Sequence, residues 1–340
     1  MATTSLAAHA QAPVGPPAAA VARGAPSPSP HGPPEGALED EARKLPARID
    51  RIEVHHSGGL WTTQAFVVER ELTFREGEVV TKEQWRLSIL RLWNTQIFAR
   101  VAARIEERGA ERVAVIDLED RWSLIPLFEF HYGGRATWFM AGLSEHNFMG
   151  RYLQADLIYE YFDGESGGLV LFRDPRFLNK RLELRAILGR TVRPRPAYVV
   201  QRGPRVFVSL LKLERDDTLR FGASLDIFND HFLPPIEGYG NPRLPPDMQT
   251  AIFEPSLRVG RVDVQRLQQD GATFEVRPAF GTTLRTGVLH PYAQIVGELL
   301  AFKALGSRFG LAARVRAGTQ TPVAEPHLEF WLGGLDTIRG

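Results

Sequence analysis

The sequence predicts a small α+β domain followed by an all-β transmembrane antiparallel β-barrel, which is incomplete and has about ten strands. Two observations carry this prediction: a helical repeat flanked by short strands within residues 50–122, and an apolar–polar alternation that recurs from 127 to 340. A third concerns residues 1–49. They are rich in Ala, Pro, Gly and Ser and are expected to be disordered, because they cannot bury a core.

Composition narrows the classes of function. The chain has 340 residues with 41 Lys and Arg against 40 Asp and Glu, so its net charge of +1 gives no reason to expect a nucleic-acid partner. It contains no cysteine, which excludes disulfides, thiolate metal sites and cysteine nucleophiles. No run approaches the roughly 20 apolar residues of a spanning helix, but this argues only against helical membrane proteins, since barrel strands alternate.

The N-terminal segment contains one processing signal. Ala8-His9-Ala10 has the small-x-small pattern of a signal-peptidase site, but the basic and apolar regions that should precede it are missing. We therefore expect the natural start of the protein to lie upstream.

The α+β domain is predicted from helical spacing and caps. Thr81, followed three residues later by Gln84, forms a capping-box pattern, and Thr62 and Thr63 are expected to cap a shorter helix. The predicted elements are, in chain order, strand Arg51–His55, helix Gln64–Glu69, a helix from Thr81 to about Phe98, and strands Val101–Glu107 and Arg112–Leu118.

The second region alternates with a period of two. In residues 152–162, for example, Leu157 and Tyr159 share one face while Asp156 and Glu160 share the other. A soluble sandwich also alternates, but the heavily charged second face is typical of a wet barrel lumen. Tyr159, Tyr161 and Phe228 are expected on the apolar face, as members of an interfacial girdle. Residues 190–202 and 229–250 are interpreted as surface loops, because the first is rich in Arg and the second in Pro and Gly.

Several motifs resemble those of one protein family. The helix end Leu92–Phe98 and the closing Asp117–Asp120 resemble a POTRA domain. Asn147 and Gly150 match a turn after the first barrel strand, and Asp174-Pro175 matches the hairpin between the third and fourth strands. The ending contains a Gly-Gly pair and an apolar-Arg-Gly tripeptide, as in the lumen-inserted loop of the family: Gly333, Gly334, Ile338, Arg339 and Gly340. Together these motifs resemble the BamA/TamA superfamily of outer-membrane assembly barrels, which is also called the bacterial surface antigen family.

This resemblance implies a function and a location. It implies a barrel in the bacterial outer membrane, a POTRA-like domain (50–122) in the periplasm, and insertion or translocation of proteins. The implied partners are unfolded outer-membrane or secreted client proteins, outer-membrane lipid, and periplasmic or lipoprotein partners. Arg339 would fold into the lumen and pair with acidic side chains of the inner face. Because further strands follow this loop in the family, residues 127–340 are expected to be the first part of a longer barrel.

Two other readings stay open. One is a surface antigen or pore without an assembly role, and the other is a soluble α+β binding protein with a β-sandwich. No enzyme activity, cofactor or metal is expected. His55 and His56 are adjacent and would point to opposite faces of a strand. Ser144 lacks the context of a nucleophile, and His146 is interpreted as part of a turn.

Overall fold

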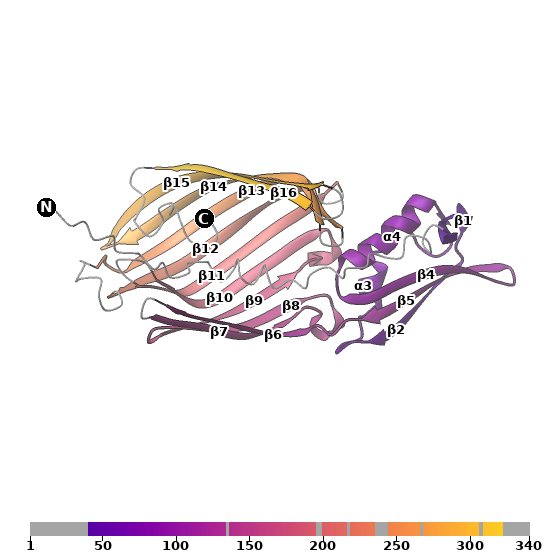
Figure 1. Cartoon of the computed structure of the whole chain (residues 1–340), viewed down its shortest axis with the longest axis horizontal. Helices are drawn as coiled ribbons and strands as arrows, with labels where there is room; N and C mark the ends of the chain where they lie inside the picture. Colours follow the sequence, from indigo (N-terminus) through magenta and orange to yellow (C-terminus); the bar gives the residue numbers. More distant parts are fainter. Residues whose placement is uncertain are drawn as a thin grey trace.

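A computed structural model places an α+β module at one end of a large curved sheet (Figure 1). It describes residues 40–133, 136–194, 199–215, 218–234, 244–265, 268–305 and 309–321. The predicted loop motif from Gly333 to Gly340 and most of the N-terminal segment 1–49 lie outside the described residues.

The module packs two helices on a three-stranded sheet of order β2–β5–β4, in which β2 and β5 are parallel and β4 and β5 antiparallel. A short β1–β3 pair lies in the half of the module away from the barrel (Figure 1). The elements are β1 (Ala47–Arg48), β2 (Arg51–Gly58), α3 (Ala65–Glu69), β3 (Val79–Val80), α4 (Lys82–Asn94), β4 (Phe98–Arg108) and β5 (Glu111–Asp120).

The helix α4 is fixed by its cap and by its apolar face. The Thr81 hydroxyl accepts a hydrogen bond from the backbone amide of Gln84, and the Gln84 side chain accepts one from the backbone amide of Thr81. The predicted capping box is therefore confirmed. Trp85, Ile89 and Leu92 are fully buried against the sheet. The helix ends at Asn94 rather than near Phe98, because the positive φ of Gln96 turns the chain into β4. The predicted Thr cap of α3 is wrong: its N-cap is Gln64, without a side-chain bond.

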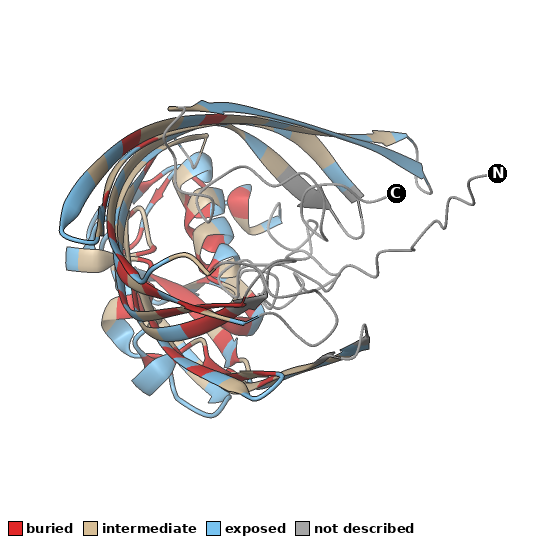
Figure 2. Ribbon diagram, turned by 90° about the vertical axis from the view of Figure 1, so that its left-hand side faces the viewer, coloured by how far each residue is buried: buried red, intermediate tan, exposed pale blue. Residues whose placement is uncertain are grey.

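The second region forms one antiparallel sheet of eleven strands in which every described strand pairs with its neighbours in sequence, from β6 to β16. Figure 2 shows these strands curving around a common axis. The strands are β6 (Leu124–Gly133), β7 (Ala136–Glu145), β8 (Gln154–Phe162), β9 (Glu165–Asp174), β10 (Leu182–Pro194), β11 (Val199–Glu214), β12 (Leu219–Leu233), β13 (Met248–Gln265), β14 (Gln268–Arg285), β15 (Val288–Leu305) and β16 (Phe309–Gln320). The 3-10 turn η1 (Phe148–Gly150) lies between β7 and β8, and η2 (Phe177–Asn179) lies between β9 and β10.

The two faces of this sheet differ as the alternation predicts. One row of exposed apolar side chains runs in register across six neighbouring strands of the outer face: Leu143, Leu157, Val170, Leu188, Val206 and Ile227. The inner face carries buried polar and charged side chains, among them Asp156, Glu160 and Asp230. An outer surface this apolar is stable in lipid rather than in water.

Three predictions about this sheet need correction. Phe228 does not belong to an outer girdle, because it is 1% exposed and shares the inner face with Asp226 and Asp230. The loop predicted for 229–250 is shorter, since β12 runs to Leu233 and β13 begins at Met248. The loop predicted for 190–202 is shorter as well, since its described ends belong to β10 and β11.

Among the described residues, no helix combines the length and the hydrophobicity needed to cross a bilayer.

Candidate functional site at the module–barrel junction

The turn after β7 holds the module against the barrel sheet. Gly150 accepts a hydrogen bond at its carbonyl from the Gln64 amide at 2.8 Å, and the Gln64 side chain donates to the Met149 carbonyl at 2.9 Å. Gly150 has a φ of +70°, and a Cβ built on it would lie 2.1 Å from the Thr62 carbonyl oxygen. This close approach therefore requires glycine.

A buried polar chain runs through the same turn. The Asn147 side chain donates to the Thr63 hydroxyl at 2.9 Å and accepts from the Tyr152 amide at 2.8 Å. Thr63 in turn donates to the Asp120 carboxylate, which also contacts His56 Nδ1 at 3.1 Å. Asn147, Thr63 and Asp120 are between 1% and 3% exposed. Since every member has a partner, the chain fixes the end of β5 against the turn between β7 and β8.

The second turn adds a buried ion pair. Arg176 donates to both carboxylate oxygens of Glu71, at 2.7 Å and 3.0 Å, and its amide donates to Asp174 Oδ1 at 2.9 Å. The Glu71 side chain is 2% exposed and that of Arg176 is 16% exposed. The Pro175 carbonyl accepts a further bond from Arg176 at 3.1 Å. A fork-to-fork pair of this kind fixes orientation as well as position.

Burial changes the acidity of two groups beside these turns. Burial lowers the pKa of the His146 imidazole below its ordinary value of 6.5, and the positive charge of Arg173 lowers it further. The carboxylates of Asp156 and Glu145 act in the opposite direction but are outweighed. Burial also raises the pKa of the Tyr152 hydroxyl. Neutral forms of both groups are therefore favoured at the junction.

The cluster of Ser144, His146 and Asp156 does not have the order of a hydrolase triad. Ser144 donates to Asp156 Oδ1 at 2.6 Å and lies 3.0 Å from His146 Nε2, so the hydroxyl stands between the other two groups. In a triad the imidazole stands between the serine and the carboxylate. The described residues also contain no group of three or more His, Cys, Asp or Glu side chains placed to hold a metal.

The inner wall of the barrel carries paired charges. Arg202 binds both oxygens of Asp230 at 2.8 Å, and Arg205 binds Asp226 at 2.9 Å and 2.8 Å. The Arg202 guanidinium also lies over the Phe228 ring, 3.7 Å from its centroid. Phe228 is thus a platform for an inner-wall cation rather than an anchor in lipid.

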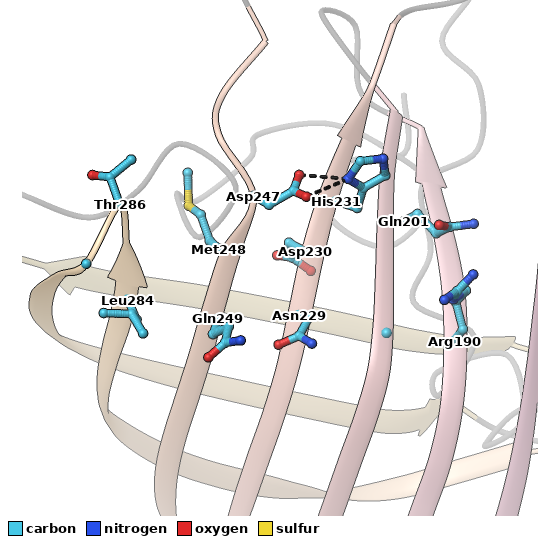
Figure 3. A pocket seen from close by; sticks show the side chains of 12 residues that line it. Arg190, Gln201, Asn229, Asp230, His231, Asp247, Met248, Gln249, Leu284 and Thr286 are labelled. Atoms are coloured by element: carbon cyan, nitrogen blue, oxygen red, sulfur yellow. Dashed lines mark hydrogen bonds and ion pairs between the residues drawn. The ribbon is translucent and has the colours of Figure 1, made fainter.

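A cavity of about 550 Å³ lies at the end of the strands away from the module. Figure 3 shows His231 and Asp247 facing each other at its rim, and His231 Nδ1 lies 2.7 Å from Asp247 Oδ1. Arg190, Gln201 and Asn229 add further polar groups. Met248 and Leu284 add apolar groups, so the lining is mixed and carries no specific chemistry by itself.

No described strand pairs with the outer sides of the edge strands, which are β2 and β4 in the module sheet and β6 and β16 in the barrel sheet. In the module β2 is one such edge, and there the Ile52 amide donates to Glu76 Oε1 at 2.8 Å instead of to a strand. Because peptide groups alternate in direction along a strand, those of Val54 and His56 face the same open side.

In the barrel sheet the corresponding edge is β6. The His146 amide donates to the Ser123 carbonyl at 3.1 Å, so odd-numbered residues of this strand bond to β7 and even-numbered ones face outward. Trp122 Nε1 donates to the Leu124 carbonyl at 2.7 Å, and Pro126 has no amide hydrogen. At its module end the outward side of β6 therefore cannot form the full set of hydrogen bonds with an added strand, but it can do so from Phe128 onward.

The predicted site residues fall into two groups. Asn147 and Gly150 lie in the turn after β7, and Asp174 and Pro175 lie where β9 ends and its turn begins, so the two motifs follow the second and fourth strands of the sheet and not the first and third as predicted. Outside the described residues lie Gly333, Gly334, Ile338, Arg339 and Gly340. The partners of these turns on the module, Thr63 and Glu71, were not predicted from the sequence, and neither was the bond from Thr63 to Asp120. No periodicity could mark them, because they pair with residues between 57 and 105 positions away.

The chain is similar to known proteins in fold and not in sequence. No protein-family model matches the sequence, and no curated protein matches it. Among solved structures, BamA from Haemophilus ducreyi lacking POTRA domains 1–3 is similar, with a TM-score of 0.58 and 15% sequence identity over 85% of this chain and 60% of that chain. The chain has the BamA barrel fold.

The BamA fold confirms the resemblance predicted from the sequence motifs, at the level of fold. The chain spans 60% of the length of the BamA chain that it matches. CdiB from Acinetobacter baumannii also matches, over 86% of this chain and 65% of that chain at 9% identity, but its TM-score of 0.42 is too low to add to the argument.

Proposed function

We propose that the protein is an outer-membrane β-barrel of the BamA/TamA type that inserts or translocates other proteins, and that its α+β module is a POTRA-like domain in the periplasm. One observation carries the proposal: a module with an open edge strand, β2, is held rigidly at the end of a barrel sheet whose first strand, β6, is also an open edge. An unfolded client can add a strand to each edge in turn.

The mechanism is non-covalent. A client segment in extended form donates to and accepts from the outward peptide groups of Val54 and His56 on β2. The junction then determines where that segment is presented, because Arg176–Glu71 and Asn147–Thr63 fix the module relative to the first barrel hairpins. At β6 a client strand would pair from Phe128 onward, since Trp122 and Pro126 block the first positions.

The test uses the full chain in phospholipid vesicles together with an unfolded outer-membrane protein as client. Folding of the client is followed by the shift in gel mobility between heated and unheated samples. Val54→Pro removes one outward amide hydrogen from β2 and leaves the bonds to β5 in place, because proline is tolerated at an outward edge position. We expect client folding to slow severalfold with Val54→Pro and to be unchanged with Val54→Thr.

Two outcomes would count against the proposal. Equal client folding in vesicles with and without the protein favours a surface antigen or pore without an assembly role. Failure of the chain to associate with vesicles at all favours a soluble binding protein.

A further inference from the structure

An exposed apolar patch lies where the module meets the first barrel strand. We call the three residues Leu60, Trp61 and Trp122 the collar patch. Their exposed fractions are 39%, 39% and 62%, which is unusual for two tryptophans and a leucine in a folded domain. The patch belongs to two segments that meet: Gly59 lies against Asp120, and a Cβ built on Gly59 would be 3.4 Å from the Arg121 carbonyl.

The collar patch continues the outer face of the barrel. The bond from the His146 amide to the Ser123 carbonyl extends the β6–β7 pairing by one residue beyond Leu124. Ser123 is buried on the inner side, so Trp122 falls on the outer side together with Phe128 and Phe130. Those two side chains are 75% and 55% exposed, and they belong to the apolar surface that the barrel presents to lipid.

The indole N–H of Trp122 does not need water as a hydrogen-bond partner. Its N–H already donates to the Leu124 carbonyl at 2.7 Å, so the ring can enter the boundary of a lipid leaflet without leaving an unsatisfied donor. Tryptophan is enriched at this depth because it combines a large apolar surface with one polar group. Exposed cationic side chains, Arg151 and Lys180, follow the neighbouring turns η1 and η2, where lipid phosphates would lie.

We propose that the collar patch rests in the interfacial layer of the phospholipid leaflet on the module side of the barrel. The patch thereby adds a lipid contact to the protein contacts that hold the module. This inference rests on the membrane-barrel part of the proposed function and not on client assembly.

The test measures which tryptophans are close to lipid. The full chain is reconstituted in phosphatidylcholine–phosphatidylglycerol vesicles with and without brominated acyl chains, which quench nearby indoles. Insertion of the barrel is checked independently by its heat-dependent gel mobility. We expect Trp122→Phe to lose a large part of the bromine-sensitive fluorescence, and Trp85→Phe, which removes a fully buried indole of the module core, to lose none.

A second measurement covers the case in which Trp122→Phe does not fold. Because the chain has no cysteine, Trp61→Cys can carry a single environment-sensitive dye. Val79→Cys is the matched control, since Val79 is 64% exposed and lies in β3, in the half of the module away from the barrel (Figure 1). We expect a blue shift and bromine quenching at position 61 only.

The proposal is overturned if the barrel inserts and Trp122→Phe keeps the full bromine-sensitive fluorescence, or if the dyes at 61 and 79 both report water. Failure of the barrel to insert would instead contradict the membrane location in the proposed function.

Discussion

The Glu71–Arg176 pair gives the sharpest prediction, because it joins the module to the barrel across 105 positions of sequence. Arg176→Ala would leave the Glu71 carboxylate, which is 2% exposed, without its two hydrogen bonds to Arg176 and with only the longer 4.0 Å contact to Arg70 Nε. Breaking one side of a buried pair costs about 3–5 kcal/mol. The docked state should then open roughly 140- to 3,700-fold more often, at about 1.4 kcal/mol for each factor of ten.

Hydrogen exchange measures this opening directly. The Gln64 amide is bonded to the Gly150 carbonyl across the junction, so its exchange rate reports how often the module separates from the turn. Arg176→Ala should accelerate its exchange by the factor given above. Replacing both partners, Glu71→Met with Arg176→Met, should restore part of the protection, because no buried carboxylate is left without Arg176, although Arg70 loses its 4.0 Å contact with Glu71.

An exposed ion pair of the module provides the control. Arg112 and Glu107 are 46% and 73% exposed, so Arg112→Ala should change the same exchange rate by less than about fivefold, corresponding to about 1 kcal/mol at most. If Arg176→Ala leaves the exchange of Gln64 unchanged, the pair does not hold the junction and the reasoning fails.

Three further predictions concern other residues of the module and junction. Gly150→Ala should destabilise the docked state by about 1–3 kcal/mol, because its Cβ would collide with the Thr62 carbonyl; Gly164→Ala, at a φ of +96° with no atom within 4 Å, is the control that carries only the backbone strain, and equal losses in thermal unfolding would refute the contact. His146 has a lowered pKa in the folded protein, so its contribution to stability is complete above its ordinary pKa of 6.5 and is lost as pH falls through the folded pKa; in urea titrations between pH 8 and pH 5, His146→Gln should flatten this dependence, and an unchanged slope would contradict it. Thr81→Ala should lower the stability of the module by about 1 kcal/mol through loss of the N-cap of α4, whereas Thr81→Ser should retain it, as circular dichroism melts can show.

Much of the fold could be predicted because periodicity is a local property. The alternation of Leu157 and Tyr159 with Asp156 and Glu160 marks the two faces of β8, and the Thr81–Gln84 pair marks the start of α4. Phe228 shows the limit of this reasoning. Its aromatic ring suggested an outer girdle, but its position between Asp226 and Asp230 assigns it to the inner face, where the guanidinium of Arg202 covers it.

The site was predicted only in part, because a motif shows one side of a contact. Asn147 and Gly150 were singled out as turn residues, yet their roles depend on Thr63 and Gln64 in the module. Thr63 was expected to cap a helix. It bonds instead to Asp120 and Asn147, an arrangement that follows from tertiary packing and has no local signature.

The measurement that tests the central claim most directly is disulfide cross-linking of a client strand to the open edge of β6. Phe130→Cys places a single thiol on this edge strand in a chain that has no other cysteine, and Ala141→Cys places one on the same outer face of β7, which β6 and β8 already pair on both sides. Each variant is reconstituted in vesicles with an unfolded outer-membrane protein that carries one cysteine in its last strand. The account predicts a cross-linked product at 130 and none at 141. Equal yields at both positions, or none at 130 while the client folds, would contradict it.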